Sequence, residues 1–337
     1  MPEMSVIIVN WNGKRFLDDC LGSLRRQTFR DFETIVVDNG SSDGSTEHIR
    51  VHFSEVKLVA LAENRGFAGG NIPGYELASG NLIVLLNNDT EADPAWLEAI
   101  HEASILYPLA GSFASKMMYF HARDRIENCG FEMGAGGATL DLGRDELDSA
   151  DWKTCREVFG ACGGAVAYRR SMLRDIGFLD PDFFMVYEDV DLSFRAQLHG
   201  YSCIYVPNAI VFHHYRASLG AGSAQQVFYS QRNIEFVYFK NMPLGLILQS
   251  LPQRLIYEIG AAIYSFRRGL GGSFFNGKLS AIKHLPSLWQ KRTQIQRSMT
   301  VDASHIRSLM KPVFSSKWRK LISSLGVSLS DRQGISS

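Results

Sequence analysis

The strongest chemical signal in the sequence is a carboxylate at the end of an apolar run. Leu82–Leu86 is uniformly apolar, and Asn87, Asn88 and Asp89 follow it at once. Such a run predicts a buried strand of a parallel sheet, and these sheets bind ligands just beyond the carboxyl ends of their strands. Asp89 is therefore placed to bind a hard divalent cation. Because Asn and Asp are also frequent turn residues, this segment alone leaves a metal ligand and an ordinary turn open.

A second carboxylate, Asp38, ends another apolar run and opens the segment DNGSSDGS. A carboxylate at this point could accept a hydrogen bond from a nucleobase N–H, while the glycines and serines supply backbone amides at a helix start. The same segment would also form a capped strand-to-helix turn without any ligand. It favours a nucleotide pocket without requiring one.

A glycine-rich segment, NRGFAGGN, runs from Asn64 to Asn71. Its three glycines allow the backbone to approach a ligand closely, and Arg65 could pair with a base or a phosphate. Tight packing of the loop is the alternative explanation.

Three carboxylates stand close together in the segment EDVD, at Glu188, Asp189 and Asp191. Like charges at this spacing should raise one another's pKa unless a cation or hydrogen-bond donors compensate, which suits a general base for a hydroxyl group. Asp189 could instead be only a helix N-cap, with Asp191 favouring the helix dipole. The aromatic residues Phe183 and Phe184 just before them offer ring faces for a sugar or lipid, or belong to the core.

His213 ends a strand-like segment, and Arg216 follows shortly after it. The imidazole is a candidate metal ligand, and the guanidinium is a candidate clamp for a diphosphate. A structural histidine is the alternative.

The segments between these clusters alternate between strand and helix patterns. We expect strands at 6–9, 34–37, 57–61 and 82–86, and helices at 15–27, 45–53 and 74–78. This alternation predicts a parallel sheet with right-handed crossovers, whose four polar strand ends should form one cleft. Residues 10–15 read NWNGKR, so neither the GxGxxG of a dinucleotide-binding oxidoreductase nor a Walker A sequence follows the first strand.

The later segments are less regular. Residues 134–157 are rich in glycine and charge, which predicts a mobile loop. We expect helices at 171–176 and from about 189 to 200, and a strand over 202–213. Beyond residue 225 the pattern is helical, and we expect four prolines to divide it into segments: Pro243, Pro252, Pro286 and Pro312.

The charge distribution divides the chain in two. Residues 1–220 carry 19 Lys and Arg against 31 Asp and Glu, a net charge of −12, whereas residues 221–337 carry 16 against 4, a net charge of +12. We expect a catalytic domain over 1–220, with a nucleotide-binding half at 1–110 and an acceptor-side half at 111–220, followed by a basic amphipathic helical extension over 221–337. The acidic half argues against a nucleic-acid partner.

The basic extension suits an anionic membrane surface, packing on the catalytic core, or contact with a second copy in a homodimer. Residues 244–266 are apolar but include Gln249, Arg254 and Glu258, so they predict a surface helix rather than a membrane span. The five cysteines form no CxxC pair, which argues against a disulfide framework or a structural zinc site. With strand-like sequence beginning at Ser5, in place of a signal peptide, we expect a cytoplasmic protein, peripheral at the inner face of the cell membrane.

Taken in order, six segments resemble the family 2 glycosyltransferases with the GT-A fold, and among them the bacterial rhamnosyltransferase-like enzymes that build cell-envelope polysaccharide. The segments are SVIIVNWNG, VDNGSSDGS, ENRGFAGGN, LLNNDTE, FGACGGAVAYRRSML and FFMVYEDVDLSFR, which span about residues 4–216. The resemblance implies an α/β fold with a mostly parallel, nucleotide-binding sheet flanked by helices. It also implies inverting transfer from a nucleotide-diphosphate sugar, dTDP-rhamnose-like or a UDP-sugar, to a hydroxyl of a lipid-linked or polysaccharide acceptor.

The resemblance further implies roles for individual residues. Asp189 would be the base that deprotonates the acceptor, with Glu188 as the next candidate. Asp89 would bind Mg²⁺ or Mn²⁺ in a DxD-like motif whose first acidic position is here an amide, and His213 would be a further metal contact. The donor would be bound by a larger set: Asn10, Asp38, Asn64, Arg65, Gly66, Asn71, Asn88, Gly163, Gly164 and Arg216. The chain departs from the family at Ile72, where a second asparagine is common.

Two other functions stay open at the level of sequence. A sugar-phosphate nucleotidyltransferase also uses a nucleotide-binding sheet, but it would need a glycine-rich basic loop after the first strand. A membrane-surface scaffold would keep the fold without activity, although intact Asp89 and Asp189 argue against it. Release of a nucleoside diphosphate rather than pyrophosphate distinguishes a glycosyltransferase from a nucleotidyltransferase. Donor hydrolysis distinguishes it from an inactive scaffold.

Overall fold

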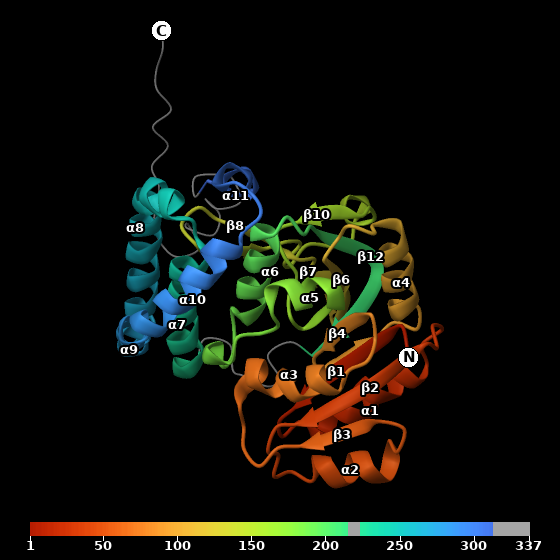
Figure 1. Cartoon of the computed structure of the whole chain (residues 1–337). Coiled ribbons are helices and arrows are strands. Elements are labelled where there is room, and N and C mark those ends of the chain that lie inside the picture. Colours follow the sequence, from red (N-terminus) through yellow and green to blue (C-terminus); the bar gives the residue numbers. More distant parts are fainter. Residues whose placement is uncertain (215–222, 313–337) are drawn as a thin grey trace.

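The computed structural model describes residues 1–214 and 223–312. Within these residues, a sheet of ten strands runs through the molecule and helices cover both of its faces (Figure 1). The strand order is β10-β12-β6-β11-β4-β1-β2-β3, with β5 paired to β12 and β7 to β6. The domain boundary expected at residue 220 lies outside the described residues.

The first half is the predicted parallel sheet. The strands β1 (Met4–Asn10), β2 (Phe32–Asp38), β3 (Lys57–Ala60) and β4 (Leu82–Leu86) run parallel to one another. Neighbouring residues of β1 face opposite layers, because Val6 and Ile8 pack into the core on one side of the sheet and Ile7 into the core on the other. Burial on both faces explains why these strands are apolar along their whole length.

The connecting helices are α1 (Lys14–Arg25), α2 (Ser45–His52) and α3 (Gly66–Leu77). The prediction of a helix limited to 74–78 is wrong, because the glycine-rich segment is itself the first part of α3. Its glycines let the helix approach the sheet closely: a Cβ on Gly74 would lie 2.5 Å from Cγ2 of Ile7, and one on Gly70 would lie 2.8 Å from Cγ1 of Val9.

The second half mixes strand directions. β11 (Ala165–Arg169) lies antiparallel between β4 and β6 (Ser112–Tyr119), while β12 (Cys203–His213) runs parallel to β6. The carboxyl end of β12 therefore reaches the same edge of the sheet as that of β4. The same part of the chain also contains α4 (Trp96–Leu106), α5 (Arg170–Ile176), α6 (Glu188–Leu198), β5 (Thr90–Ala92) and β7 (Ala122–Asn128).

Residues 134–157 contain more regular structure than their composition predicts. β9 (Thr139–Asp141) pairs with β8 (Phe131–Met133), and η1 (Ala150–Trp152) and β10 (Arg156–Val158) follow. The segment was expected to be a mobile loop, but buried side chains hold it against the rest of the molecule. Trp152 is one of them, and its carbonyl accepts a hydrogen bond from the Tyr205 hydroxyl at 2.9 Å.

The C-terminal part is helical, as predicted. It comprises α7 (Ala224–Asn241), α8 (Leu244–Arg267), α9 (Gly271–Lys283), α10 (Leu285–Ser298) and α11 (Ala303–Leu309). Pro243 and Pro286 lie at helix starts, but the expected break at Pro252 is wrong because this residue lies inside α8. It is on the exposed side of that helix, where water can satisfy the carbonyl left without an N–H donor.

α7 lies between the catalytic elements and the outer helices. It packs against α6 and η2 (Pro181–Phe183) on one side and against α9 on the other (Figure 1). In the part of the chain that the structure describes, no helix has the length and apolar character needed to cross a membrane.

Candidate active site

Hydrogen bonds join the ends of three neighbouring strands. The Asn88 amide donates to Oδ1 of Asn10 at 2.7 Å, and the Asn10 amide donates to Oδ1 of Asp38 at 3.0 Å. The backbone N–H of Ser41 donates to the other Asp38 oxygen at 3.1 Å. A side chain at Gly13 would collide with this group, since its Cβ would lie 2.0 Å from the Asn88 amide nitrogen. Buried Asn10 and Asp38 and half-buried Asn88 thus form one polar group, which we call the strand-end group.

A neighbouring asparagine holds the glycine-rich loop. The Asn39 amide donates to Oδ1 of Asn64 at 3.0 Å and to the carbonyl of Gly66 at 2.9 Å, and its oxygen accepts from the backbone N–H of Arg65 at 2.9 Å. The Arg65 side chain is exposed. Asn39 was not among the predicted site residues, although its place beside Asp38 in the DNG sequence was a usable signal.

Asn71 does not join the strand-end group. Its side chain is buried, and the amide donates to the carbonyl of Phe67 at 2.9 Å within α3. Arg216 lies outside the described residues.

The turn before α6 has an unusual backbone. Phe184, Val186 and Tyr187 have φ angles of 62°, 58° and 70°, a region that non-glycine residues rarely adopt and that costs about 1–3 kcal/mol per residue. Asn233 of α7 compensates by donating to the carbonyls of Phe183, Met185 and Val186 at 2.8–2.9 Å. Gly66 also fits against this turn, since a Cβ there would lie 2.2 Å from the Phe184 carbonyl oxygen.

The turn places two carboxylates at the start of α6. Asp189 is half-buried, and its Oδ2 accepts a hydrogen bond from the backbone N–H of Gly163 at 2.8 Å. Burial outweighs this donor and the N–H of Val190, and raises the pKa of Asp189 to about 6. Glu188 is buried, and burial together with the charge of Asp189 raises its pKa well above the usual range.

Asp191 behaves differently from the two residues before it. It is fully buried, which opposes ionisation, but Lys240 at 2.7 Å and Arg195 at 3.0 Å hold its pKa below the usual range. The expectation that all three carboxylates raise one another's pKa is therefore wrong for Asp191, because Lys240 comes from α7. Asp191 therefore anchors the helix. The pKa values of Asp189 and Glu188 are raised, as expected for a carboxylate that accepts a proton near neutral pH.

Asp89 and His213 meet where β5 pairs with β12. Nε2 of His213 lies 3.1 Å from Oδ1 of Asp89, and its Nδ1 lies 2.8 Å from Oε2 of Glu127. Burial disfavours the imidazolium, but the two carboxylates outweigh burial and raise the pKa of His213 to about 10. Glu127, on β7, had no signal in the sequence, because only the pairing of β7 with β6 brings it here.

The Asp89–His213 pair offers one carboxylate oxygen and one imidazole nitrogen. This donor set suits Mn²⁺ better than Mg²⁺, which prefers oxygen ligands. Among residues 1–214 and 223–312, no three Asp, Glu, His or Cys side chains are arranged to hold a metal ion together. The pair therefore fits a cation whose coordination is completed by water or by a diphosphate.

The parts of the site connect through Asn87, Asn88 and Asp89. Asn88 belongs to the strand-end group, Asp89 contacts His213, and the backbone N–H of Asn87 donates to the carbonyl of Gly164 at 2.9 Å. Gly163, next to Gly164, lies beside the Asp189 side chain, because a Cβ there would be in van der Waals contact, at 3.4 Å, with both Cβ of Asp189 and Cε1 of Phe67. The strand-end group, the Asp89–His213 pair and the Asp189 carboxylate thus lie along one edge of the sheet.

Comparison with known proteins was made on both sequence and structure. The family model "Glycosyl transferase family 2" matches residues 5–177. The chain is 25% identical over 254 residues to the N-acetylglucosaminyl-diphospho-decaprenol L-rhamnosyltransferase of Mycobacterium tuberculosis, which covers 66% of this chain and 80% of that protein.

Two solved structures have a similar fold. GalNAc-T7 with UDP, GalNAc and Mn²⁺ gives a TM-score of 0.57 at 16% identity, covering 71% of this chain and half of that one. The mannosyltransferase PcManGT from Pyrobaculum calidifontis, in complex with GDP-Man and Mn²⁺, gives 0.53 at 16% identity, covering 96% of this chain and 84% of that one.

Proposed function

Because the chain belongs to glycosyltransferase family 2 and has the GT-A fold, we propose that it transfers a sugar, with inversion, from a nucleotide-diphosphate sugar to an acceptor hydroxyl in cell-envelope glycan synthesis. The observation that carries this proposal is the arrangement of three groups along one sheet edge. These are the strand-end group, the Asp89–His213 pair, and Asp189 on the facing turn.

In this proposal the nucleotide lies over the ends of β1, β2 and β4. Asp38 would accept a hydrogen bond from the base edge, and the loop at Asn64, Arg65 and Gly66 would close the side of the pocket. Asn10 donates a hydrogen bond to the Asp38 carboxylate, and Asn88 in turn donates one to Asn10. Uracil and thymine present the same N–H edge, so the pocket accommodates a UDP-sugar or a dTDP-sugar.

Asp189 would act as the base. It removes the proton from the acceptor hydroxyl as the acceptor oxygen bonds to the anomeric carbon, and the bond from that carbon to the diphosphate breaks with its electron pair on the leaving nucleotide. The N–H of Gly163 orients the carboxylate, and a pKa of about 6 leaves it ionised at neutral pH. Glu188 is buried behind it and is the second candidate for this role.

Asp89 and His213 would hold a divalent cation, Mn²⁺ in preference to Mg²⁺. When bound, such a cation neutralises charge on the departing diphosphate. Glu127 would orient the His213 ring through Nδ1, the usual arrangement around metal-binding histidines.

The similarity to a rhamnosyltransferase whose name includes a diphospho-decaprenol supports a dTDP-rhamnose-like donor and a lipid-linked acceptor. Such an acceptor would be met at a membrane surface.

The test is a panel of UDP- and dTDP-sugars with Mn²⁺ and a polyprenyl-diphosphate-linked acceptor. We expect one donor to release its nucleoside diphosphate, D189N to lose turnover while binding nucleotide normally in calorimetry, and D89N to lose the metal-dependent part of nucleotide binding. Release of pyrophosphate from a sugar phosphate and a nucleoside triphosphate would instead identify a nucleotidyltransferase. Absence of both transfer and donor hydrolysis across the panel would leave a scaffold.

A further inference from the structure

The outer face of α8 is apolar although it is exposed. Leu244, Leu248, Leu251, Leu255, Ile259 and Phe266 follow one another at helical spacing, and each is 47–67% exposed. We call these six residues the outer face of α8. Exposed apolar surface of this extent marks a contact with another apolar surface.

The charged side chains of α8 point the other way. Arg254 is 5% exposed, and its guanidinium contacts Glu235 of α7 and Glu258 of α8. Lys278 of α9 completes this network, at 2.7 Å from Glu258. A helix at a water-exposed surface buries its apolar side and exposes its charges, whereas α8 does the opposite.

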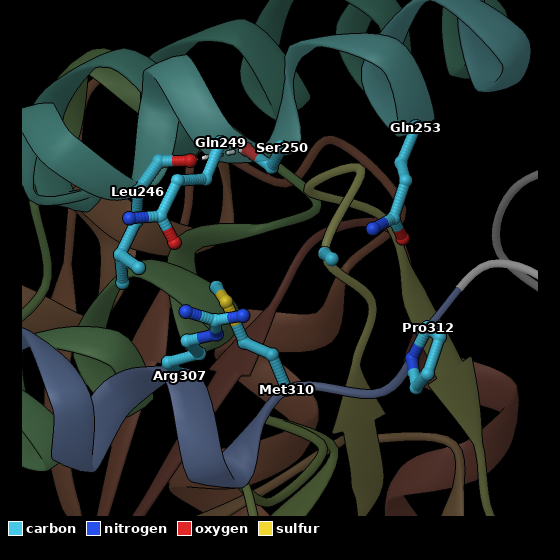
Figure 2. Close-up of a pocket in the computed structure, with 8 residues that line it drawn as sticks. Leu246, Gln249, Ser250, Gln253, Arg307, Met310 and Pro312 are labelled. Carbon is cyan, nitrogen blue, oxygen red and sulfur yellow. Dashed lines mark hydrogen bonds between the residues drawn. The ribbon is translucent and has the colours of Figure 1, made fainter.

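The polar amides of α8 also avoid the outer face. Figure 2 shows Gln249, Ser250 and Gln253 on the side toward α11, where they line a pocket of about 210 Å³ together with Arg307 and Met310. The outer face thus carries neither the charged residues of α8 between 244 and 266, Arg254 and Glu258, nor its amides, Gln249 and Gln253.

The apolar surface continues onto α9. The rings of Phe266 and Phe275 lie 5.7 Å apart, and Leu279 and Ile282, one and two turns further along α9, are 52% and 60% exposed. Figure 1 shows α8 and α9 at the outside of the molecule, beyond α7. The surface therefore extends over two helices.

Charge decides between a membrane and a second copy of the chain. Among described residues 223–312, the exposed charged side chains are six basic ones and a single acidic one, Asp302; the basic ones are Arg267, Arg268, Lys283, Arg297, Arg307 and Lys311. Arg267 and Arg268 directly follow the outer face of α8. Two such surfaces would repel each other, whereas anionic lipid headgroups complement them.

We propose that the outer face of α8 and its continuation on α9 insert into the interfacial region of an anionic lipid bilayer, with Arg267, Arg268 and Lys283 at the headgroups. The helix lies along the surface, because Arg254 and Glu258 on its other side stay within the protein. This contact stands independently of the proposed sugar transfer. It would hold α7, and with it the turn before Asp189, one helix layer from the lipid.

The test is co-sedimentation of the full chain with vesicles of phosphatidylcholine and phosphatidylglycerol at a 7:3 ratio. We expect wild type to sediment with these vesicles, and L248Q/I259Q to bind at least tenfold more weakly. L106Q/L109Q is the matched control and should bind like wild type, because Leu106 and Leu109 are at least as exposed as Leu248 and Ile259 but lie at the end of α4 and just after it. R267Q/R268Q should lose the preference for phosphatidylglycerol and the sensitivity to salt.

A second measurement separates folding from docking. Circular dichroism of L248Q/I259Q without vesicles should match that of wild type, including the near-ultraviolet signal of Trp289 on α10, which is 59% exposed. Equal vesicle binding by wild type and L248Q/I259Q would overturn the proposal, since another part of the chain would then be responsible. A second result would also overturn it: wild type does not bind vesicles but sediments as a dimer, and L248Q/I259Q sediments as a monomer. A second copy of the chain would then cover the outer face of α8.

Discussion

Two carboxylates two positions apart in sequence, Asp189 and Asp191, have opposite pKa shifts. Both accept hydrogen bonds, but Asp191 faces Lys240 and Arg195, whereas the charged neighbour that acts on Asp189 is the carboxylate of Asp141. The cations outweigh burial and lower the pKa of Asp191, whereas burial dominates at Asp189 and raises its pKa. Sequence spacing alone does not separate these roles.

The pKa of Asp189 predicts how transfer depends on pH. The base must be ionised to accept a proton, so kcat should fall as the pH decreases through about 6. D189N should reduce kcat by about 10²–10⁴-fold and remove that inflection. A pH–rate profile at saturating donor measures both effects, with nucleotide affinity over the same pH range as the control. An unchanged inflection in D189N would assign it to another group.

Glu127 provides a second prediction at the scale of a residue. E127Q keeps the shape of the side chain but removes the charge beside Nδ1 of His213, so Mn²⁺ affinity in the presence of UDP should fall by about 10–100-fold. Calorimetric Mn²⁺ titration measures this directly. Glu157 on β10 is an exposed carboxylate, and E157Q should leave the affinity unchanged. Equal affinities for E127Q and wild type would remove Glu127 from the site.

Among the elements, α7 has a part in the site that its position after residue 220 does not suggest. Its Asn233 contacts three carbonyls of the turn that carries Glu188 and Asp189. Arg232, next to it, donates to the carbonyls of Asp182 and Phe183 at 2.7 and 2.8 Å. A helix outside the matched family region thus stabilises the strained backbone under the base.

This support predicts the effect of N233A. Three carbonyls would lose their donor, at a cost of about 1–3 kcal/mol, and the turn would relax and displace Asp189. We expect kcat to fall between about tenfold and a hundredfold, while nucleotide affinity stays near that of wild type because the strand-end group is untouched. Asn276 on α9 is exposed, so N276A is the control. A loss of nucleotide affinity equal to the loss of kcat would indicate general unfolding instead.

The elements also show which features the sequence determines locally. β4 was predicted to the residue, at 82–86, because an apolar run bounded by polar residues specifies burial on both faces. α3 was not, because glycines argue against a helix unless a sheet lies close enough to need them. Asp38, Asn10, Asp89 and His213 come together as strand ends should. Glu127 lies 86 positions from His213, and such a pairing depends on strand register that no local pattern carries.

For the molecule as a whole, the motif-based assignment to family 2, the GT-A fold and the glycosyltransferase activity class are confirmed by the family match and the solved relatives. The division into a catalytic domain and an extension stays a prediction. Contacts nevertheless cross this division. α7 packs on α6, and Lys240 of α7 and Lys291 of α10 both form ion pairs with half-buried Asp180. The change in net charge near residue 220 therefore does not coincide with a break in the packing of the molecule.

The centre of these contacts is Lys240. Its ammonium is 1% exposed and lies 2.7 Å from a carboxylate oxygen of Asp180 and 2.7 Å from one of Asp191, while Lys291 of α10 lies 2.7 Å from Asp180. Burial opposes ionisation of both carboxylates, but the lysines and Arg195 lower the pKa of each below its usual range. A depressed carboxylate pKa stabilises the fold above the pKa of the unfolded chain, about 4, and this contribution is lost as the pH falls below that value.

K240M should therefore destabilise the whole molecule in a pH-dependent way. At pH 7 the carboxylates of Asp180 and Asp191 lose their shared cation, and we expect the free energy of unfolding to fall by about 3–5 kcal/mol. Near pH 4 these carboxylates begin to bind protons in the variant, whereas in wild type their lowered pKa values keep them ionised, so the difference between variant and wild type should shrink. Urea unfolding at pH 7 and pH 4 measures it, with K283M, at an exposed lysine of α9, as the control. If K240M unfolded the C-terminal helices alone and left the catalytic sheet at wild-type stability, the two parts would be independent, because a shared buried network requires them to unfold together.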